Sequence, residues 1–186
     1  MRWMWIDRIV ELQPKRRMVA IKNVSLAEEH LHDHFAAEAG AVESCLAALP
    51  VMPASLIIEG MAQTAGILVG HAEDFREKVI LAKISRAELS RDATPGCTLR
   101  YTAEIDRMDA IGASTRGTVE LFDHARPERG YEPIGTIELM FSHLDNNMGG
   151  AEFPAHNFVF GEGFKTLLRT SGIAIASDRR EPLTRR

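Results

Sequence analysis

Cysteine and long apolar runs are both scarce in this sequence. The two cysteines, Cys45 and Cys97, lie far apart and not in a metal-binding spacing, which indicates a reducing compartment rather than a disulfide framework. The longest apolar stretches fall short of a membrane span and are interrupted by polar residues such as Glu59 and Gln63. Charged residues near the start also interrupt any signal-peptide pattern. We therefore expect a cytoplasmic protein without a membrane partner.

An excess of positive charge is absent as well. The formal net charge is -4, which argues against a nucleic-acid binder that depends on a general basic field. The length of 186 residues suits one domain with a substantial core. The hydrophobic content of 45% and charged content of 26% are typical of a globular protein.

Strand patterns surround one helical stretch. Two segments rich in Ile, Val and Met, separated by a turn at Pro14, predict a β-hairpin. Alternation of apolar and polar residues and strand-type composition predict four more strands. The expected strands are 5–12, 17–24, 80–84, 99–106, 115–121 and 134–141.

The helical stretch begins after Pro53 and continues to about Val69, with apolar residues on all sides rather than in one stripe. Such a helix is surrounded by protein. Its glycines, Gly60, Gly66 and Gly70, each cost about 1 kcal/mol of helix propensity, and we expect them to allow close approach of another backbone. The predicted fold class is α+β, with a sheet wrapped around one helix.

Glu59 is an acidic residue inside this apolar helix. If it is buried, the loss of hydration favours a protonated carboxyl group, which is the form that a general acid requires. Gln63 lies one turn later on the same face and is placed to orient Glu59 by a hydrogen bond. The alternative is that Glu59 lies at an edge of the helix and faces water. The helix pattern alone gives the two interpretations similar weight.

A second cluster of candidate residues consists of His30, His32, Asp33 and His34. Imidazoles and a carboxylate are common zinc ligands. The cluster comes close to the metallo-β-lactamase signature but lacks the residue that this motif places between its second histidine and its aspartate. The surrounding elements also lack the alternation of strands and helices of that fold. We therefore expect no metal here, and a role for His34 depends on other evidence.

Two motifs supply that evidence: Asp33-His34-Phe35, and the block from Met52-Pro53 to Met61-Ala62-Gln63. Further matches lie in the first two expected strands and in the stretch after the helix. Together they resemble the 3-hydroxyacyl-acyl carrier protein dehydratases of bacterial fatty-acid synthesis, over nearly all of residues 5–142. The resemblance implies a hotdog fold, in which an antiparallel sheet wraps around one long central helix.

The resemblance also implies a hydro-lyase mechanism. Neutral His34 would remove the C2 proton of a 3-hydroxyacyl thioester, and protonated Glu59 would help the 3-hydroxyl group to leave as water. The N–H of Ala54, at the helix start, would hydrogen-bond the thioester carbonyl as negative charge grows on it. The other residues assigned to substrate binding are Phe35, Met52, Pro53 and Gln63. Neither a metal nor an organic cofactor is needed.

The expected partners are an acyl thioester on acyl carrier protein or coenzyme A, and a second copy of the chain. A helix that is apolar on all sides has a face that a single sheet leaves uncovered, and a two-fold partner would cover it. The resemblance places His34 of one chain opposite Glu59 of the other in such a dimer. Whether dimers assemble further stays open.

The sequence departs from the family pattern in ways that indicate a divergent member. Asp33, Ala36 and Ala54 stand where the family has Gly, Pro and Gly. We expect a hotdog domain over residues 1–144 with an inserted helical flap at about 36–50 beside the active site, then an extension over 145–186. That extension is expected to hold a peripheral helix within 158–175 and a mobile tail. The alternative functions are a hotdog thioesterase, in which Glu59 activates water, and an acyl-binding hotdog protein without turnover.

Overall fold

The computed structural model describes residues 3–33, 37, 48–144, 154, 157 and 159–174. In that part of the chain, six strands are joined by helices and a short 3₁₀ turn. The strands are β1 (Arg8–Gln13), β2 (Arg17–Asn23), β3 (Val79–Leu89), β4 (Cys97–Met108), β5 (Gly112–Asp123) and β6 (Tyr131–His143). The helical elements are α1 (Glu29–Asp33), α2 (Ala54–Ala72), η1 (Pro127–Arg129) and α4 (Glu162–Thr170).

The strands form one antiparallel sheet in the order β1-β2-β4-β5-β6-β3. The expected hairpin is β1 and β2, and Lys15 takes a positive φ of 62° in its turn. All six expected strands are present. Strand β3 continues past the predicted end at Ile84 to Leu89 because its backbone pairs with β6, although residues 81–88 are exposed and show no apolar alternation.

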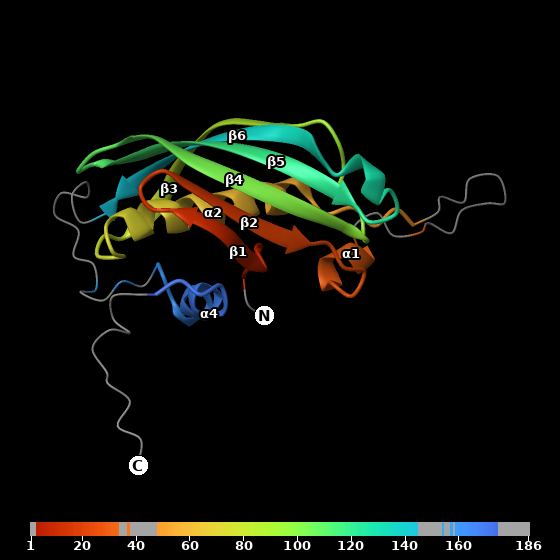
Figure 1. Ribbon diagram of the computed structural model, residues 1–186, viewed down its shortest axis with the longest axis horizontal. Coiled ribbons are helices and arrows are strands. Elements are labelled where there is room, and N and C mark those ends of the chain that lie inside the picture. Colours follow the sequence, from red (N-terminus) through yellow and green to blue (C-terminus); the bar gives the residue numbers. More distant parts are fainter. Residues whose placement is uncertain are drawn as a thin grey trace, which may run out of the picture.

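Helix α2 lies in the concave side of the curved sheet (Figure 1), against strands β2 to β6. Twelve of its 19 residues are buried. Met61, Leu68 and Ile57 are among the most buried side chains of the core, together with Leu99 and Ile137 from the sheet. This arrangement confirms the predicted hotdog fold.

At Gly60 the expected close approach of another backbone is present, from Trp5, whereas at Gly66 and Gly70 the nearest groups in the described chain are side chains. A methyl group at Gly60 would lie 2.6 Å from the Tyr101 ring and 2.9 Å from the carbonyl oxygen of Trp5. A methyl group at Gly70 would collide with the ring of Phe160. At Gly66 the nearest atom is Cε1 of Phe141, at an ordinary 3.4 Å.

The predicted peripheral helix within 158–175 is α4, and it lies beside β1 (Figure 1). Leu167 and Leu168 are buried and belong to the main hydrophobic core. No helix in the described part of the chain is long and apolar enough to cross a membrane. The flap at 36–50 falls largely outside the described residues, as does the tail after residue 174. The division of the chain at residue 144 and the cytoplasmic location stay predictions.

Candidate active site

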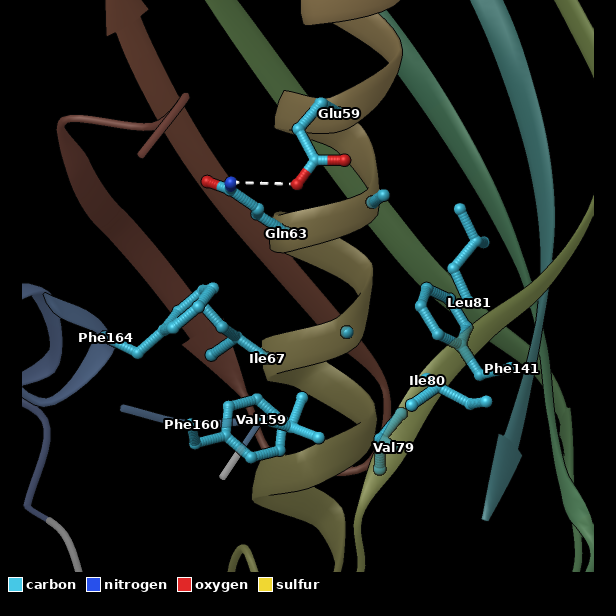
Figure 2. A pocket seen from close by; sticks show the side chains of 12 residues that line it. Glu59, Gln63, Ile67, Val79, Ile80, Leu81, Phe141, Val159, Phe160 and Phe164 are labelled. Carbon is cyan, nitrogen blue, oxygen red and sulfur yellow. Dashed lines mark hydrogen bonds between the residues drawn. The ribbon is translucent and has the colours of Figure 1, made fainter. Parts of the chain in front are cut away.

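An open groove of about 240 Å³ runs along the face of α2 that the sheet does not cover. Figure 2 shows α2 as its floor, with β3 and Phe141 on one side and the segment leading into α4 on the other. Glu59 and Gln63 lie at one end, and the remaining lining is apolar apart from the backbone. The lining residues are Glu59, Ala62, Gln63, Gly66, Ile67, Val79, Ile80, Leu81, Phe141, Val159, Phe160 and Phe164.

Glu59 is half-buried on this open face. Its Oε1 accepts hydrogen bonds from Nε2 of Gln63 at 3.0 Å and from the indole Nε1 of Trp3 at 3.3 Å. Figure 2 shows the other carboxyl oxygen directed across the groove, toward the β3 side. The environment of Glu59 is therefore intermediate between the two predicted ones, burial within the apolar helix and exposure to water. Glu59 is neither buried in the core nor fully exposed.

Gln63 is fixed more firmly than Glu59. Its side chain is 5% exposed, and its Oε1 accepts a hydrogen bond from the backbone N–H of Trp5 at 2.8 Å. Since a backbone N–H only donates, this contact sets which way the amide points, with its NH₂ group toward Glu59. The same Nε2 also donates to the carbonyl oxygen of Trp3 at 3.1 Å. The expected hydrogen bond between Gln63 and Glu59 is thus present, and the N-terminal segment holds it in place.

Trp3 is a site residue that the sequence reasoning missed. It is 61% exposed, and its ring meets that of Trp5 edge-on with centroids 5.4 Å apart. An indole N–H is a donor only, so it suits a carboxylate oxygen. The signal in the sequence was a second tryptophan two residues before Trp5, on the same side of an extended segment.

Other predicted substrate residues surround a different hollow. Met52, Pro53 and Ala54 line a cavity of about 460 Å³ beside the loop after β3, which contains Arg91. Helix α2 begins here without a side-chain cap, and Ala54 is exposed, whereas Met52 is only 1% exposed and its N–H bonds the carbonyl oxygen of Ala93. The single chain therefore does not bring these residues into the groove of Glu59.

His34 and Phe35 lie outside the described residues. The helix before them, α1, is placed by a contact between His30 and Trp5, whose rings meet edge-on at 5.0 Å. Trp5 is the residue whose N–H holds Gln63. The segment that leads to His34 therefore begins beside Trp5, in the N-terminal segment that orients Gln63 and, through it, Glu59. The positions and roles of His34 and Phe35 stay predictions from the family resemblance.

Solved structures with this fold include a dehydratase complex and a thioesterase family protein. The chain superposes with a TM-score of 0.53 and 16% identity on the dehydratase heterocomplex ApeI:P from Xenorhabdus doucetiae, over 76% of this chain and 83% of that one. It superposes with a TM-score of 0.54 and 12% identity on a thioesterase family protein from Silicibacter pomeroyi, over 73% of this chain and 82% of that one. At such low identity the likeness shows the fold alone.

Sequence comparison is more specific. The chain is 30% identical over 143 residues to the 3-hydroxyacyl-[acyl-carrier-protein] dehydratase FabZ of Clostridium kluyveri, which covers 76% of this chain and 86% of the relative. The family model of the FabA-like domain matches residues 2–122. That range contains Glu59, Gln63, Trp3 and the whole of α2, and it ends before the segment that forms one wall of the groove. The protein belongs to the FabA-like family.

Proposed function

We propose that this FabA-like protein is a hydro-lyase that converts 3-hydroxyacyl thioesters to trans-2-enoyl thioesters and water, as the name of its FabZ relative describes. One observation carries the proposal. A carboxyl group with one oxygen held by two N–H donors stands at the polar end of an otherwise apolar groove. This geometry suits a proton donor beside the reacting end of a fatty acyl chain.

The two oxygens of Glu59 have different tasks in this mechanism. Oε1 accepts N–H bonds from Gln63 and Trp3, so the proton to be transferred belongs on Oε2, which is directed into the groove. The C2 proton passes to His34, the C2–C3 double bond forms, and the C3–O bond breaks. The departing hydroxyl group takes the proton from Oε2 and leaves as water, and the proton on His34 later returns through solvent to Glu59.

Ala54 supplies the electrostatic part of the proposal. Its N–H belongs to the first turn of α2, where backbone donors have no partner within the helix and the helix dipole favours negative charge. A thioester carbonyl oxygen that gains enolate character would be stabilised there. Ala54 and Glu59 are separated by about 7.5 Å along the helix axis, from a rise of about 1.5 Å per residue.

A direct assay tests the reaction. Purified protein is incubated with a 3-hydroxyacyl thioester while enoyl absorbance and free thiol are recorded in parallel. The proposal expects enoyl product without thiol release. Thiol release without enoyl product would replace it with a thioesterase, and neither signal, over a series of chain lengths, would replace it with an acyl-binding protein.

We further propose that two copies of the chain assemble as a dimer with composite active sites. Strand β3 is an edge strand of 11 residues, and residues 81–88 are exposed, including Leu81 at 39% and Ile84 at 46%. A long exposed edge with apolar side chains favours pairing with another strand. A two-fold axis at β3 would also bring a second copy over the adjoining groove, where Glu59 lies.

Mixing of two inactive variants tests the composite site. His34→Ala and Glu59→Gln homodimers are unfolded together and refolded as a mixture. Random pairing makes half of the dimers mixed, each with one intact site of two, so activity should return to about a quarter of normal. If refolded wild type recovers while the mixture stays inactive, His34 and Glu59 act within one chain. This is the main alternative to the composite site, because the contact between His30 and Trp5 places the segment before His34 beside the N-terminal segment of the same chain.

The substrate carrier is proposed to be acyl carrier protein, following the name of the FabZ relative. The test compares kcat/KM for one 3-hydroxyacyl group on acyl carrier protein, on coenzyme A and on pantetheine. A clear preference for acyl carrier protein over the two small carriers is expected. Equal kcat/KM values for all three substrates would show that the enzyme does not recognise the carrier.

A further inference from the structure

One wall at the end of the groove farthest from Glu59 is built by residues beyond the range that the family model matches. Val159 and Phe160 lie there, and Phe164 lines the same wall farther up, whereas the match to the FabA-like model ends at residue 122. Figure 2 shows Val159 and Phe160 at one side of the C-terminal half of α2, opposite Val79. One wall at this end therefore lies beyond the range that the family model matches.

Hydrogen bonds hold this segment on both sides. Nδ2 of Asn157 donates to the carbonyl oxygens of Phe75 at 3.0 Å and Glu77 at 2.9 Å, and Oδ1 of Asn157 accepts from the N–H of Val159 at 3.1 Å. After α4, the hydroxyl of Ser171 accepts a hydrogen bond from the N–H of Ile9 at 3.0 Å. The wall is thus anchored to the loop after α2 and to β1.

Aromatic packing closes the end. The ring of Phe160 is 7% exposed and meets Phe75 at 4.9 Å and Phe164 at 5.9 Å, in both cases edge-on, which is a favourable geometry. It occupies the place of the missing side chain at Gly70. Phe75 also meets His71 edge-on, and burial lowers the pKa of His71 so that the imidazole is neutral near pH 7. The far end therefore carries no charge from this ring.

The distribution of polar and apolar residues along the groove matches that of an acyl thioester. Its polar groups, Glu59 and Gln63, are at one end, and Ile67 lies eight residues beyond Glu59 on the same helix, which corresponds to about 12 Å. Between these points the floor consists of small residues, Ala62 and Gly66, and the walls are apolar. An unbranched apolar tail whose reactive polar head remains at Glu59 fits this distribution.

We propose that the segment Val159–Phe164 sets the longest acyl chain that the enzyme accepts, with Phe160 as the stop. This inference rests on the proposed dehydratase function, since that function places the thioester at Glu59. Each methylene group that enters the groove adds apolar burial until the chain meets Phe160. Longer chains have to remain outside or displace a ring that is packed from three sides by Phe75, Phe164 and α2.

Two variants should move the limit in opposite directions. Phe160→Leu opens the far end and should admit longer chains. Gly66→Leu projects a side chain from the groove floor, where the nearest atom to a new Cβ is 3.4 Å away, and should exclude chains that the wild type accepts. Leu168→Ala is the matched control, because Leu168 is a buried residue of α4 that does not line the groove.

Binding and turnover are measured separately. Saturated acyl-pantetheine thioesters of increasing length are titrated by calorimetry, and the matching 3-hydroxyacyl thioesters are assayed for enoyl product. Wild-type affinity should rise about fourfold per methylene group and then level off, from about 0.8 kcal/mol per buried methylene. The length at which it levels off should increase in Phe160→Leu and decrease in Gly66→Leu.

The outcomes separate this inference from the proposed function. Shifted binding profiles without turnover by the wild type would refute the dehydratase function while supporting the length limit. Normal turnover with unshifted profiles in both variants would refute the length limit alone, as would a Leu168→Ala profile that shifts as much as that of Phe160→Leu. If Phe160→Leu does not fold, a shortened limit in Gly66→Leu supports the inference and an unchanged limit overturns it.

Discussion

The two faces of α2 differ in how tightly they are packed. On the face toward the sheet, the ring of Tyr101 fills the space beside Gly60, where a side chain is missing. Met61 and Leu68 are almost completely buried. On the face toward the groove, Glu59 is half-buried and Gly66 has an ordinary contact at 3.4 Å. One face is tightly packed against the sheet, and the other is the floor of the open groove.

In the proposed mechanism, one helix serves both stability and catalysis. The packed face fixes the helix, and the helix in turn fixes the direction of Glu59 and Gln63. Burial of the Tyr101 ring raises the pKa of its phenol far above the ordinary value, so this side chain stays neutral beneath the helix. Overpacking substitutions on the packed face should therefore lower stability, whereas substitutions of Glu59 on the open face should mainly lower catalysis.

The largest effect is expected for Glu59→Gln. The amide oxygen can still accept the N–H bonds from Gln63 and Trp3, so folding should be preserved, but the proton donor is lost. Turnover should fall by about 10²–10⁴-fold, the usual range for a lost proton-transfer group. The measurement is kcat with a thermal melt on the same sample. The control is Glu73→Gln, at the end of the same helix and outside the groove. Near-normal turnover of Glu59→Gln would leave Glu59 with a structural role only.

The next largest effect is expected for Ala54→Pro, which removes one N–H at the start of α2. Pro53 has φ -54° and ψ 136°, the extended conformation that a residue before proline requires, and proline is well tolerated at the first helical position. The fold should therefore persist while kcat falls by about 10²–10³-fold, as for other lost oxyanion donors. Ala54→Gly keeps the N–H and serves as the control. Equal activity of both variants would remove the Ala54 N–H from the mechanism.

The glycine pair Gly60→Ala and Gly66→Ala compares the two faces directly. At Gly60 the new methyl group would press on Tyr101 and on a backbone oxygen, and overpacking of this kind costs about 1–3 kcal/mol. At Gly66 the methyl group has room, so the gain in helix propensity, up to about 1 kcal/mol, should raise stability. Urea unfolding of both variants measures the difference. Equal losses of stability would show that the groove face is also tightly packed.

The smallest effect is expected for Trp3→Phe, which removes one donor to Glu59 and keeps an aromatic ring near Trp5. The loss of one exposed hydrogen bond, about 0.5–1.5 kcal/mol, should lower kcat roughly twofold to tenfold. The pH profile of kcat is the deciding measurement, because a residue that positions Glu59 should move it. A lower melting temperature with an unchanged profile would assign Trp3 to structure alone.

Much of the fold follows from local patterns in the sequence. Alternation and strand-type composition located the strands, the apolar stretch after Pro53 located α2, and spacing alone placed Glu59 and Gln63 one turn apart on one face. The extension of β3 to Leu89 was missed because an exposed edge strand has no buried side and hence no alternation. The side chains that fill the space at Gly60 and Gly70, the rings of Tyr101 and Phe160, were not predicted because they are distant in sequence.

The sequence by itself therefore determined the six strands, the central helix and the spacing of Glu59 and Gln63 along α2. It did not determine which side of the helix stays open, because an apolar pattern on all sides is compatible with any rotation about the helix axis. That choice came from the curved sheet, which covers one side, and from contacts across 58 and 162 residues, between Trp5 and Gln63 and between Ile9 and Ser171. Such contacts depend on the three-dimensional path of the backbone, whereas periodicity in a sequence records only neighbours within a few residues.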